Sequence, residues 1–322
     1  MKRQRGAALL LAMLTVALVA TLASAALWQQ WRSAEVESAE RRRLQASWIL
    51  VGALDWARLI LREDARANQN TGAADHLGEP WATPLEEARL SSFLAADKNN
   101  SAEELMPAFL SGEMIDLQSR LNFRNLVRTV GAGAQAKAEV SPADVTTFTR
   151  LFSLLNLPAS ELTVATANLL KTTQQAVSDP QPSESPLLPQ RYAQLRWLGL
   201  SAHTLTVLQP HVTVLPERSL LNLNTASAEA LSASIVGLDL ALAQQVVTSR
   251  ASTPFTDLKS AISRIPSATD KTVTSQNHDV RSRFFEVRAR LRLDDTLIEE
   301  RSLVQRNGMT TQVRWRERVA AS

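Results

Sequence analysis

The sequence predicts an α+β fold in which a long N-terminal helix leads into a body that closes with an antiparallel β-sheet. Three features of the 322-residue chain predict this fold. No charged residue occurs between Ala7 and Trp31, which favours a membrane helix. Residues 131–275 show mainly helical periodicity. From Arg283 onward apolar and polar residues alternate, as in strands with one buried face.

The apolar run is long enough to cross a bilayer. At about 1.5 Å per residue, roughly 20 residues cover the ~30 Å hydrocarbon core. Lys2, Arg3 and Arg5 precede the run, and such cations hold an N-terminus on the cytoplasmic side. We therefore expect one transmembrane helix over residues 7–31, with the rest of the chain across the membrane.

Three kinds of N-terminal segment fit this run. An ordinary secretory signal would be cut near Ala23-Ser24-Ala25, whereas a plain signal anchor would be kept whole. The third kind is favoured by Gly6, which stands between the cations and the apolar run. This order resembles the class III leader of type IV pilins and pseudopilins, here residues 1–6. The resemblance implies cleavage after Gly6 by a prepilin peptidase, with Ala7 as the N-methylated first residue and the helix retained.

From Trp31 to about Arg66 the helical pattern continues, first with charged residues and then with apolar residues at helical spacing. We expect one amphipathic helix that leaves the membrane and packs one face on the body. Residues 67–84 contain Asn, Gly and Pro that break any period, and they predict a loop.

Two short segments precede the helical region. Residues 114–117 predict a short strand, and residues 120–130 predict a strand that ends into a helix. Asp116 and Asn122 lie in or near these segments and could be ligand or metal groups. Turn residues that bond to the nearby backbone are the more ordinary interpretation of both.

Residues 131–275 predict an inserted all-helical domain. Ser141-Pro142-Ala143-Asp144 has the features of a helix start: a capping Ser, a Pro in the first turn and an acid near the positive helix end. Further helices are expected from residue 160, near residues 192–198 and over residues 203–208. The Pro- and Ser-rich residues 179–186 predict an exposed linker.

Residues 222–266 have the character of a SAM-like or helix-hairpin-helix unit. The run Leu221-Asn222-Leu223-Asn224-Thr225-Ala226 precedes a helical pattern, and Thr225 is expected to cap that helix. A membrane-anchored helix-hairpin-helix DNA receptor of the competence type is therefore the alternative function. Against it, such hairpins use a turn of two glycines whose amides meet a phosphate. Here Gly237 is followed by Asp239, which would repel phosphate.

Charge and composition also disfavour nucleic acid as a partner. The formal net charge is +3, and the cations of the leader account for it. An enzyme is disfavoured as well, because Cys is absent and the four His, at positions 76, 203, 211 and 278, are scattered. We expect no catalytic residue, and without Cys no disulfide stabilises the body.

The tail, residues 276–322, predicts an antiparallel sheet of about three strands. Residues 285–293, 297–304 and 310–318 alternate between apolar and polar types, and Asn307-Gly308 is a hairpin-turn signal. One face of this sheet is expected to be buried.

In this order the motifs resemble one family, the K-type minor pseudopilins of the type II, or general, secretion pathway. The motifs are Arg5-Gly6-Ala7-Ala8-Leu9-Leu10, Ile115-Asp116-Leu117-Gln118-Ser119-Arg120-Leu121-Asn122 and Leu221-Asn222-Leu223-Asn224-Thr225-Ala226. The resemblance covers most of the chain and implies a pilin-like fold, residues 32–130 and 276–322, interrupted by the helical insertion. It gives structural roles in the family motifs to Asp116, Arg120, Asn122, Asn222, Asn224 and Thr225.

The resemblance also implies a location and partners. The helix would lie in the bacterial inner membrane and the body in the periplasm, at the tip of a short pseudopilus that helps to export folded proteins. I- and J-type minor pseudopilins, the major pseudopilin, the prepilin peptidase and the inner-membrane assembly platform are the implied partners. K-type members can bind calcium, but no residue of this chain is matched to their ligands.

The fifth residue after the expected cleavage site, Leu11, supports the tip position. In most pilins this residue is Glu, which meets the N-terminal amine of a neighbouring subunit within the lipid. An unpaired charge there is expensive, so the acid favours docking against a neighbour. A subunit with Leu11 cannot make that contact, which fits the end of a filament.

Overall fold

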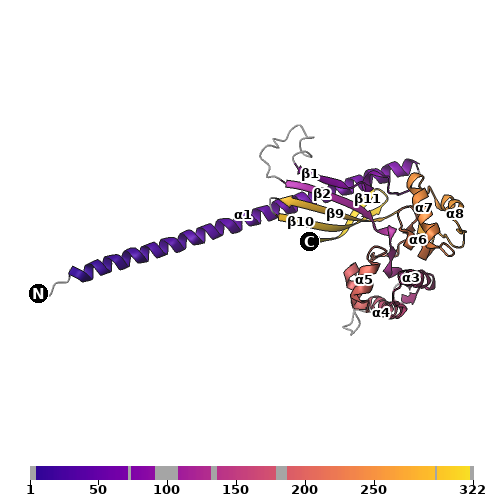
Figure 1. Cartoon of the computed structure of the whole chain (residues 1–322), viewed down its shortest axis with the longest axis horizontal. Helices are drawn as coiled ribbons and strands as arrows, with labels where there is room; N and C mark the ends of the chain where they lie inside the picture. Colours follow the sequence, from indigo (N-terminus) through magenta and orange to yellow (C-terminus); the bar gives the residue numbers. More distant parts are fainter. Residues whose placement is uncertain are drawn as a thin grey trace.

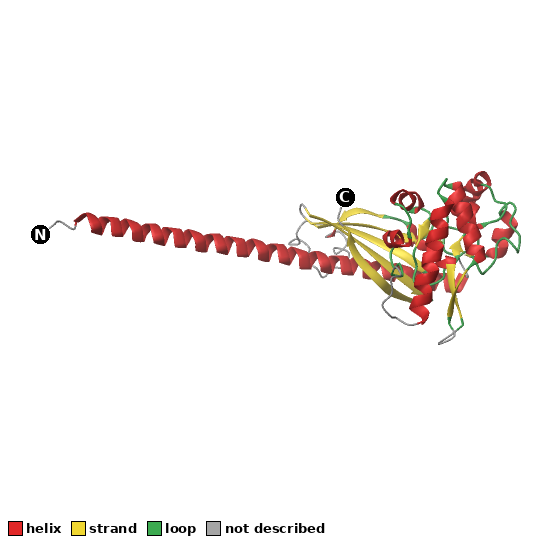
Figure 2. Ribbon diagram, turned by 90° about the horizontal axis from the view of Figure 1, so that it is seen from below, coloured by secondary structure: helices red, strands yellow, loops and turns green. Residues whose placement is uncertain are grey.

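The computed structural model describes residues 5–71, 74–90, 108–131, 136–178, 187–293 and 296–319. A single long helix projects from an α+β body (Figure 1). The sheet lies beside the second half of this helix, and the short helices gather at the end of the body farthest from the N-terminus. Figure 2 shows the same order of helix, sheet and helical part from below.

Helix α1 (Arg5–Thr71) runs without interruption over 67 residues. Residues 7–45 bury no side chain against the body, and the first buried one is Ala46. Among the described residues, α1 alone is long and apolar enough to span a membrane. The prediction of one long apolar N-terminal helix is confirmed, and this helix fits a single membrane anchor. α1 extends about one turn beyond the predicted end near Arg66.

The body is built on a five-stranded antiparallel sheet with the strand order β1-β2-β9-β10-β11. Its strands are β1 (Leu85–Arg89), β2 (Ala108–Asp116), β9 (Phe284–Leu293), β10 (Thr296–Asn307) and β11 (Thr310–Val319). The predicted C-terminal strands are confirmed as β9, β10 and β11, with a turn at Gly308, whose φ is 56°. Of the strand predicted over residues 114–117, residues 114–116 form the end of the nine-residue β2, and Leu117 lies just beyond it.

Helix α1 covers one face of the sheet. Alternate residues of a strand share a face, and those of β9 that pack toward α1 are Phe285, Val287, Ala289, Leu291 and Leu293. The residues of α1 in these two clusters recur every three or four positions: Ala46, Leu50, Leu54, Ala57 and Leu61. The amphipathic second half of the helix is thus explained by one buried stripe.

The segment after β2 differs from the prediction. The expected strand ending into a helix over residues 120–130 is wrong. The 3₁₀ helix η3 (Leu117–Ser119) is followed by β3 (Leu121–Asn122), the 3₁₀ helix η4 (Phe123–Leu126) and β4 (Val127–Val130). The side chain of Asn122 accepts a hydrogen bond from the N–H of Arg124, which tightens the backbone into a turn in place of a strand.

The helical part lies between β4 and β9. Its helices are α3 (Pro142–Leu154), α4 (Ala159–Ser178), the 3₁₀ helix η6 (Tyr192–Leu198), α5 (Ala202–Leu208), α6 (Ala228–Ser234), α7 (Leu240–Ser252) and α8 (Leu258–Arg264). Short strands complete it: β5 (Lys137–Val140) on β4, β6 (Val212–Thr213) on β3, and β7 (Leu221–Asn222) on β8 (His278–Asp279). The helix start at Ser141-Pro142 is confirmed, whereas the linker predicted over residues 179–186 lies outside the described residues.

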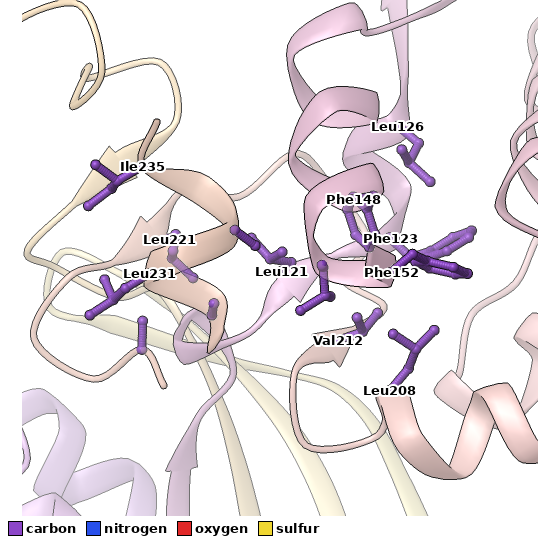
Figure 3. Packing of buried hydrophobic residues seen from close by; sticks show 14 of the residues in the cluster. Leu121, Phe123, Leu126, Phe148, Phe152, Leu208, Val212, Leu221, Leu231 and Ile235 are labelled. Carbon is purple, nitrogen blue, oxygen red and sulfur yellow. The ribbon is translucent and has the colours of Figure 1, made fainter. Parts of the chain in front are cut away.

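One apolar core holds the helical part together. Phe123 of η4 and Phe148 of α3 meet edge to face, with their ring centroids 5.4 Å apart. Figure 3 shows these rings beside Phe152, with Leu208 and Val212 below them. The same cluster reaches α6, so the helices before and after η6 share one core.

Thr225 does not cap α6, so that prediction is wrong. Ser227 caps the helix, and its Oγ accepts a hydrogen bond from the N–H of Ala230. Thr225 is instead drawn to an acceptor outside the helical part, as described below. Helices α6 and α7 are joined by a tight turn at Gly237, whose φ is 84°. The SAM-like character of residues 222–266 stays a prediction.

We expect Gly112→Ala to lower the melting temperature of the full chain. A Cβ at Gly112 would lie 2.8 Å from the carbonyl oxygen of Arg288 on the neighbouring strand, so the two strands must move apart. Overpacking of this kind costs about 1–3 kcal/mol. The measurement is thermal unfolding of the purified chain in detergent, monitored by circular dichroism.

Gly52→Ala is the matched control. A Cβ at Gly52 meets nothing within 4 Å, and the residue lies on the exposed side of α1. This substitution should stabilise the helix by about 0.5–1 kcal/mol. An equal loss of stability in both variants would contradict the proposed strand clash.

Candidate functional site

Asp116, the last residue of β2, lies where the chain leaves the sheet for the helical part. Its side chain is 2% exposed. It accepts hydrogen bonds from the N–H of Gln118 at 2.7 Å, Thr225 Oγ1 at 2.5 Å, Ser282 Oγ at 2.6 Å and Asn222 Nδ2 at 3.1 Å. Burial raises the pKa of Asp116 to about 6, against the hydrogen bonds from Ser282 and Thr225. One carboxyl group therefore joins β2, the entrance to α6 and the chain that returns to β9.

Asn222 and Asn224 hold the loop that leads into α6. Asn222 Nδ2 also lies 3.2 Å from the carbonyl oxygen of Asp75, and its Oδ1 accepts from the N–H of Asn224 at 2.9 Å. Asn224 bonds to both backbone groups of Phe255: Nδ2 donates to the carbonyl at 2.9 Å, and Oδ1 accepts from the N–H at 2.8 Å. The two amides thus fix this loop to the sheet on one side and to the segment before α8 on the other.

Arg250 of α7 holds the same loop from within the helical part. Its buried guanidinium donates to the carbonyl oxygens of Leu223 and Ala226. Burial lowers the pKa of Arg250 to about 10. The carbonyls of the Asn-Thr-Ala loop are therefore satisfied by a side chain that is distant in sequence.

Asn122 belongs to a second contact beside the Asp116 cluster. Its Oδ1 accepts from the N–H of Leu215 at 3.1 Å, and its Nδ2 donates to the carbonyl of Glu217 at 2.9 Å. The guanidinium of Arg120, next to η3, forms no hydrogen bond or ion pair with the described residues, and burial lowers its pKa. The structure thus brings Asp116, Asn222 and Thr225 into one cluster and leaves Arg120 and Asn122 next to it.

An ion-pair cluster adjoins Asp116. Arg306 of β10 places Nη1 2.6 Å from Asp64 Oδ2 and Nη2 2.5 Å from Asp75 Oδ1, and it donates to the carbonyl of Ser282 at 2.8 Å. The N–H of Ser282 donates to Asp75 Oδ2 at 2.6 Å. This cluster ties the last turns of α1, the loop after α1 and β10 to the position where the chain re-enters the sheet.

Sequence reasoning missed Asp75, Ser282 and Arg306. The Ser282–Asp75 and Arg306–Asp75 contacts join residues 207 and 231 positions apart, so no local pattern pairs them. One signal was present in the alternation of β10. Arg306 occupies the face that Val304 turns toward α1, and a charged residue on a buried face needs a buried partner.

Asp64, Asp75 and Glu79 are the group of side chains among the described residues whose oxygens lie close enough to hold a metal ion. Three carboxylates suit a hard cation such as Ca²⁺. However, the Arg306 guanidinium lies against two of them, and Glu79 Oε2 accepts from the N–H of His76 at 2.9 Å and from Trp81 Nε1 at 2.7 Å. The group fits an ion-pair cluster better than a cation site, and we assign no calcium ligand.

The N-terminal residues identified from the sequence lie at the free end of α1. Gly6 and Ala7 belong to its first turn, and Leu11 is 64% exposed, with no part of the body over it. Cleavage after Gly6 and methylation of Ala7 stay predictions.

Comparison with known proteins identifies the family. Two family models, both described as type II secretion system protein K, match residues 119–217 and 221–281. The type II secretion system protein K of Pseudomonas aeruginosa is 28% identical over 312 residues, covering 91% of this chain and 86% of the relative. The protein K of Klebsiella pneumoniae is 28% identical over 333 residues, covering 96% and 94%. The chain belongs to the protein K family of the type II secretion system. The resemblance drawn from the sequence motifs is confirmed.

A solved structure shares the fold. The crystal structure of the GspK–GspI–GspJ complex from the type 2 secretion system of enterotoxigenic Escherichia coli contains a chain with a TM-score of 0.64 to this one. The two are 18% identical, and the match covers 88% of this chain and 99% of that chain. The α+β fold with a long N-terminal helix and an antiparallel sheet therefore occurs outside this chain.

The family models coincide with the junction. The matched segments begin three residues after Asp116 and end one residue before Ser282, which are the points where the chain leaves and re-enters the sheet. The hydrogen bonds of Asp116 to Asn222, Thr225 and Ser282 link the helical part to the sheet at this junction.

The buried acids make stability depend on pH. Burial, and next the repulsion from Glu79, raise the pKa of Asp64 to about 7, although Arg306 opposes this. A carboxyl group with a raised pKa binds its proton more tightly in the folded state, so the free energy of unfolding falls as pH rises from about 4 to about 7.

Asp64→Asn should remove this contribution to the pH dependence of stability. Between about pH 5 and pH 8 the variant should lose less stability than the parent chain, by on the order of 2 kcal/mol.

The measurement is thermal unfolding of the full chain in detergent at both pH values. Burial lowers the pKa of His278 to about 4, so this residue makes the free energy of unfolding rise with pH. His278 is present in both chains, and its effect cancels when the variant is compared with the parent chain. The exposed Asp270→Asn is the control and should leave the pH dependence unchanged. The same pH dependence in Asp64→Asn and the parent chain would contradict the assignment.

Proposed function

We propose that this chain occupies the tip of the type II secretion pseudopilus, where it starts pseudopilus assembly and helps to export folded proteins across the outer membrane. Its N-terminal helix crosses the bacterial inner membrane once, with the N-terminus in the cytoplasm and the body in the periplasm. The observation that carries the tip position is Leu11, which stands at the fifth position after the expected cleavage site.

The chemistry of this position distinguishes a tip from a shaft subunit. An acid there lowers its free energy by meeting the N-terminal amine of the subunit ahead, because an unpaired charge in hydrocarbon costs several kcal/mol, about 2.5–3.5 on translocon scales. A subunit at the tip has no subunit ahead and gains nothing from the acid. Leu11, exposed along the apolar part of α1, carries no such requirement.

The place of the helical part supports the same position. It lies at the end of the body farthest from the membrane helix, to one side of the α1 axis (Figure 1). A subunit stacked further out along the filament would meet this bulk. Such an arrangement suits the last subunit of a filament better than one within the shaft.

The exposed side of α1 supports packing against other pseudopilin helices. On the side away from its buried stripe, α1 carries exposed large apolar side chains: Leu44, Trp48, Trp56 and Leu59, which are 60%, 73%, 48% and 43% exposed. The protein K relative in the solved complex assembles with GspI and GspJ. We infer I- and J-type minor pseudopilins as the partners on this face, with the major pseudopilin, the prepilin peptidase and the assembly platform as further partners.

The leader sequence, residues 1–6, predicts cleavage after Gly6 by a prepilin peptidase. On co-expression with a prepilin peptidase, the N-terminus of the full chain should move to Ala7, and Gly6→Ala should slow or abolish this cleavage. Mass spectrometry of the purified chain measures it, and Gly52→Ala is the control for a Gly→Ala change elsewhere in α1. An N-terminus at Ala26 would instead identify a removed secretory signal.

The tip position predicts that Leu11→Glu impairs secretion. With no subunit ahead, the new carboxylate stays unpaired in lipid, so pseudopilus initiation and secretion should fall about as much as in Leu14→Glu, which places an acid one turn further into the same helix. The measurement is export of a secreted enzyme, beside co-purification of the variant with its I- and J-type partners. Normal secretion by Leu11→Glu together with loss in Leu14→Glu would show that a neighbouring amine meets the acid at position 11. The subunit would then not be the foremost one.

A further inference from the structure

A groove of about 580 Å³ separates the helical part from the last strand of the sheet. Arg191, Gln194 and Pro216 line one side, and five consecutive residues of β11, 313–317, line the other. Neighbouring residues of a strand point to opposite faces. Leu303 of β10 also lines it, so the groove lies over the sheet face at β11 and, because five residues in a row line it, also reaches the open edge of that strand.

The edge of β11 is available for pairing. β11 is the last strand in the order β1-β2-β9-β10-β11, and within the described residues no strand lies beyond it. In an edge strand, alternate N–H and C=O groups point away from the sheet. Arg58 of α1 bonds to the carbonyl of Thr311 at 3.1 Å. Among the described residues, the backbone of residues 313–317 makes no hydrogen bond outside the ladder with β10.

A β-bulge shapes this edge. Leu303 of β10 pairs with Trp315 and Val304 pairs with Val313, so Arg314 has no opposite residue. Val313 packs toward α1, whereas Trp315 packs with Leu303 on the side of the helical part. The bulge thus turns Trp315 into the wall of the groove and leaves Arg314 exposed at the edge, with no carboxylate partner among the described residues.

The walls of the groove are held in place. Arg191 lies over the Trp315 ring at 4.1 Å, and its Nε is 3.4 Å from Glu317 Oε2. Gln194 Oε1 accepts from the N–H of Gln190 at 2.7 Å and of Arg191 at 3.0 Å. The groove is therefore formed before any partner arrives, which reduces the entropy lost on binding.

The charge of the lining is positive. Arg191, Arg314 and Arg316 face one acid of the groove, Glu317. Arg316 is held by Glu300 from β10 at 2.6 Å, whereas Arg314 is available to a new partner. The lining suits carboxylates, and it repels the same edge of a second copy of this chain.

We propose that the groove binds an extended polypeptide segment rich in acidic residues, which adds to the sheet beside β11. The open edge supplies main-chain hydrogen bonds, and Arg314 selects acidic side chains. This inference goes beyond the proposed function and does not depend on the tip position. It assigns the groove to a partner polypeptide, identified by its charge and extended backbone.

The test uses the full chain in detergent and a fluorescent peptide of alternating glutamate and valine. Fluorescence anisotropy should show saturable binding that weakens as salt is added. Arg314→Glu should weaken binding about tenfold or more, the loss expected for one charge-assisted hydrogen bond. Lys259→Glu, the same charge reversal on an exposed residue of α8, is the matched control and should bind as the parent chain does.

Two further peptides separate strand addition from binding by charge alone. The same peptide with alternate backbone amides N-methylated keeps its carboxylates but loses the N–H groups that pair with an edge strand, and it should bind about tenfold more weakly. A lysine–valine peptide should not bind. Equal binding by the methylated peptide, or equal losses in Arg314→Glu and Lys259→Glu, would overturn the proposal in favour of non-specific attraction.

Discussion

The structure depends on one buried carboxyl group. Asp116 stands at the point where the chain leaves the sheet, and Ser282, which donates to it at 2.6 Å, stands where the chain returns. Nearly all of the helical part is held between these two residues. If the two segments that connect the helical part to the sheet were flexible, the helical part could rotate about them. Here the two segments bond to each other, and Asn222 and Thr225 of the helical part donate to the same carboxyl group, which fixes the position and the orientation of the helical part. Directional hydrogen bonds in a low-dielectric interior are suited to this task.

The same point is linked to the membrane helix. Arg306 joins Asp64 in α1 to Asp75 and to the carbonyl of Ser282, so α1, the sheet and the root of the helical part meet within a few side chains. Burying these charges is not a source of net stability, because the desolvation of each ion offsets most of the attraction. Their value is geometric, since a mispaired arrangement leaves a buried charge without a partner. The ion pairs therefore fix how α1 sits against the sheet and the root of the helical part.

The parts of the fold predicted from the sequence are those fixed by local periodicity. The apolar run, the alternation in β9 to β11 and the Ser141-Pro142 helix start depend on neighbouring residues, and each was found. The junction depends on contacts such as Asp116 with Ser282, 166 positions apart, and no local pattern encodes them. Thr225 illustrates the limit: Thr225 and Ser227 both satisfy the capping rule, and only the distant Asp116 decides that Thr225 turns away. The family motifs singled out Asp116, Asn222 and Thr225, but not the contact between them.

The reason why the junction is polar lies in the face of the sheet that α1 does not cover. Along β9 that face carries Glu286, Arg288, Arg290 and Arg292, paired in ladders with acids of neighbouring strands such as Glu113 and Glu299. It becomes apolar at the end near the helical part, where Phe284 and Leu303 meet Leu117 and Leu215 of the chain outside the sheet. The apolar contact between the sheet and the helical part is therefore small, while each part has a core of its own. Apolar burial is not directional, and a small contact would allow many orientations of similar energy. The polar cluster selects one of them, so the carboxylate and the amides specify the arrangement that the two cores alone leave open.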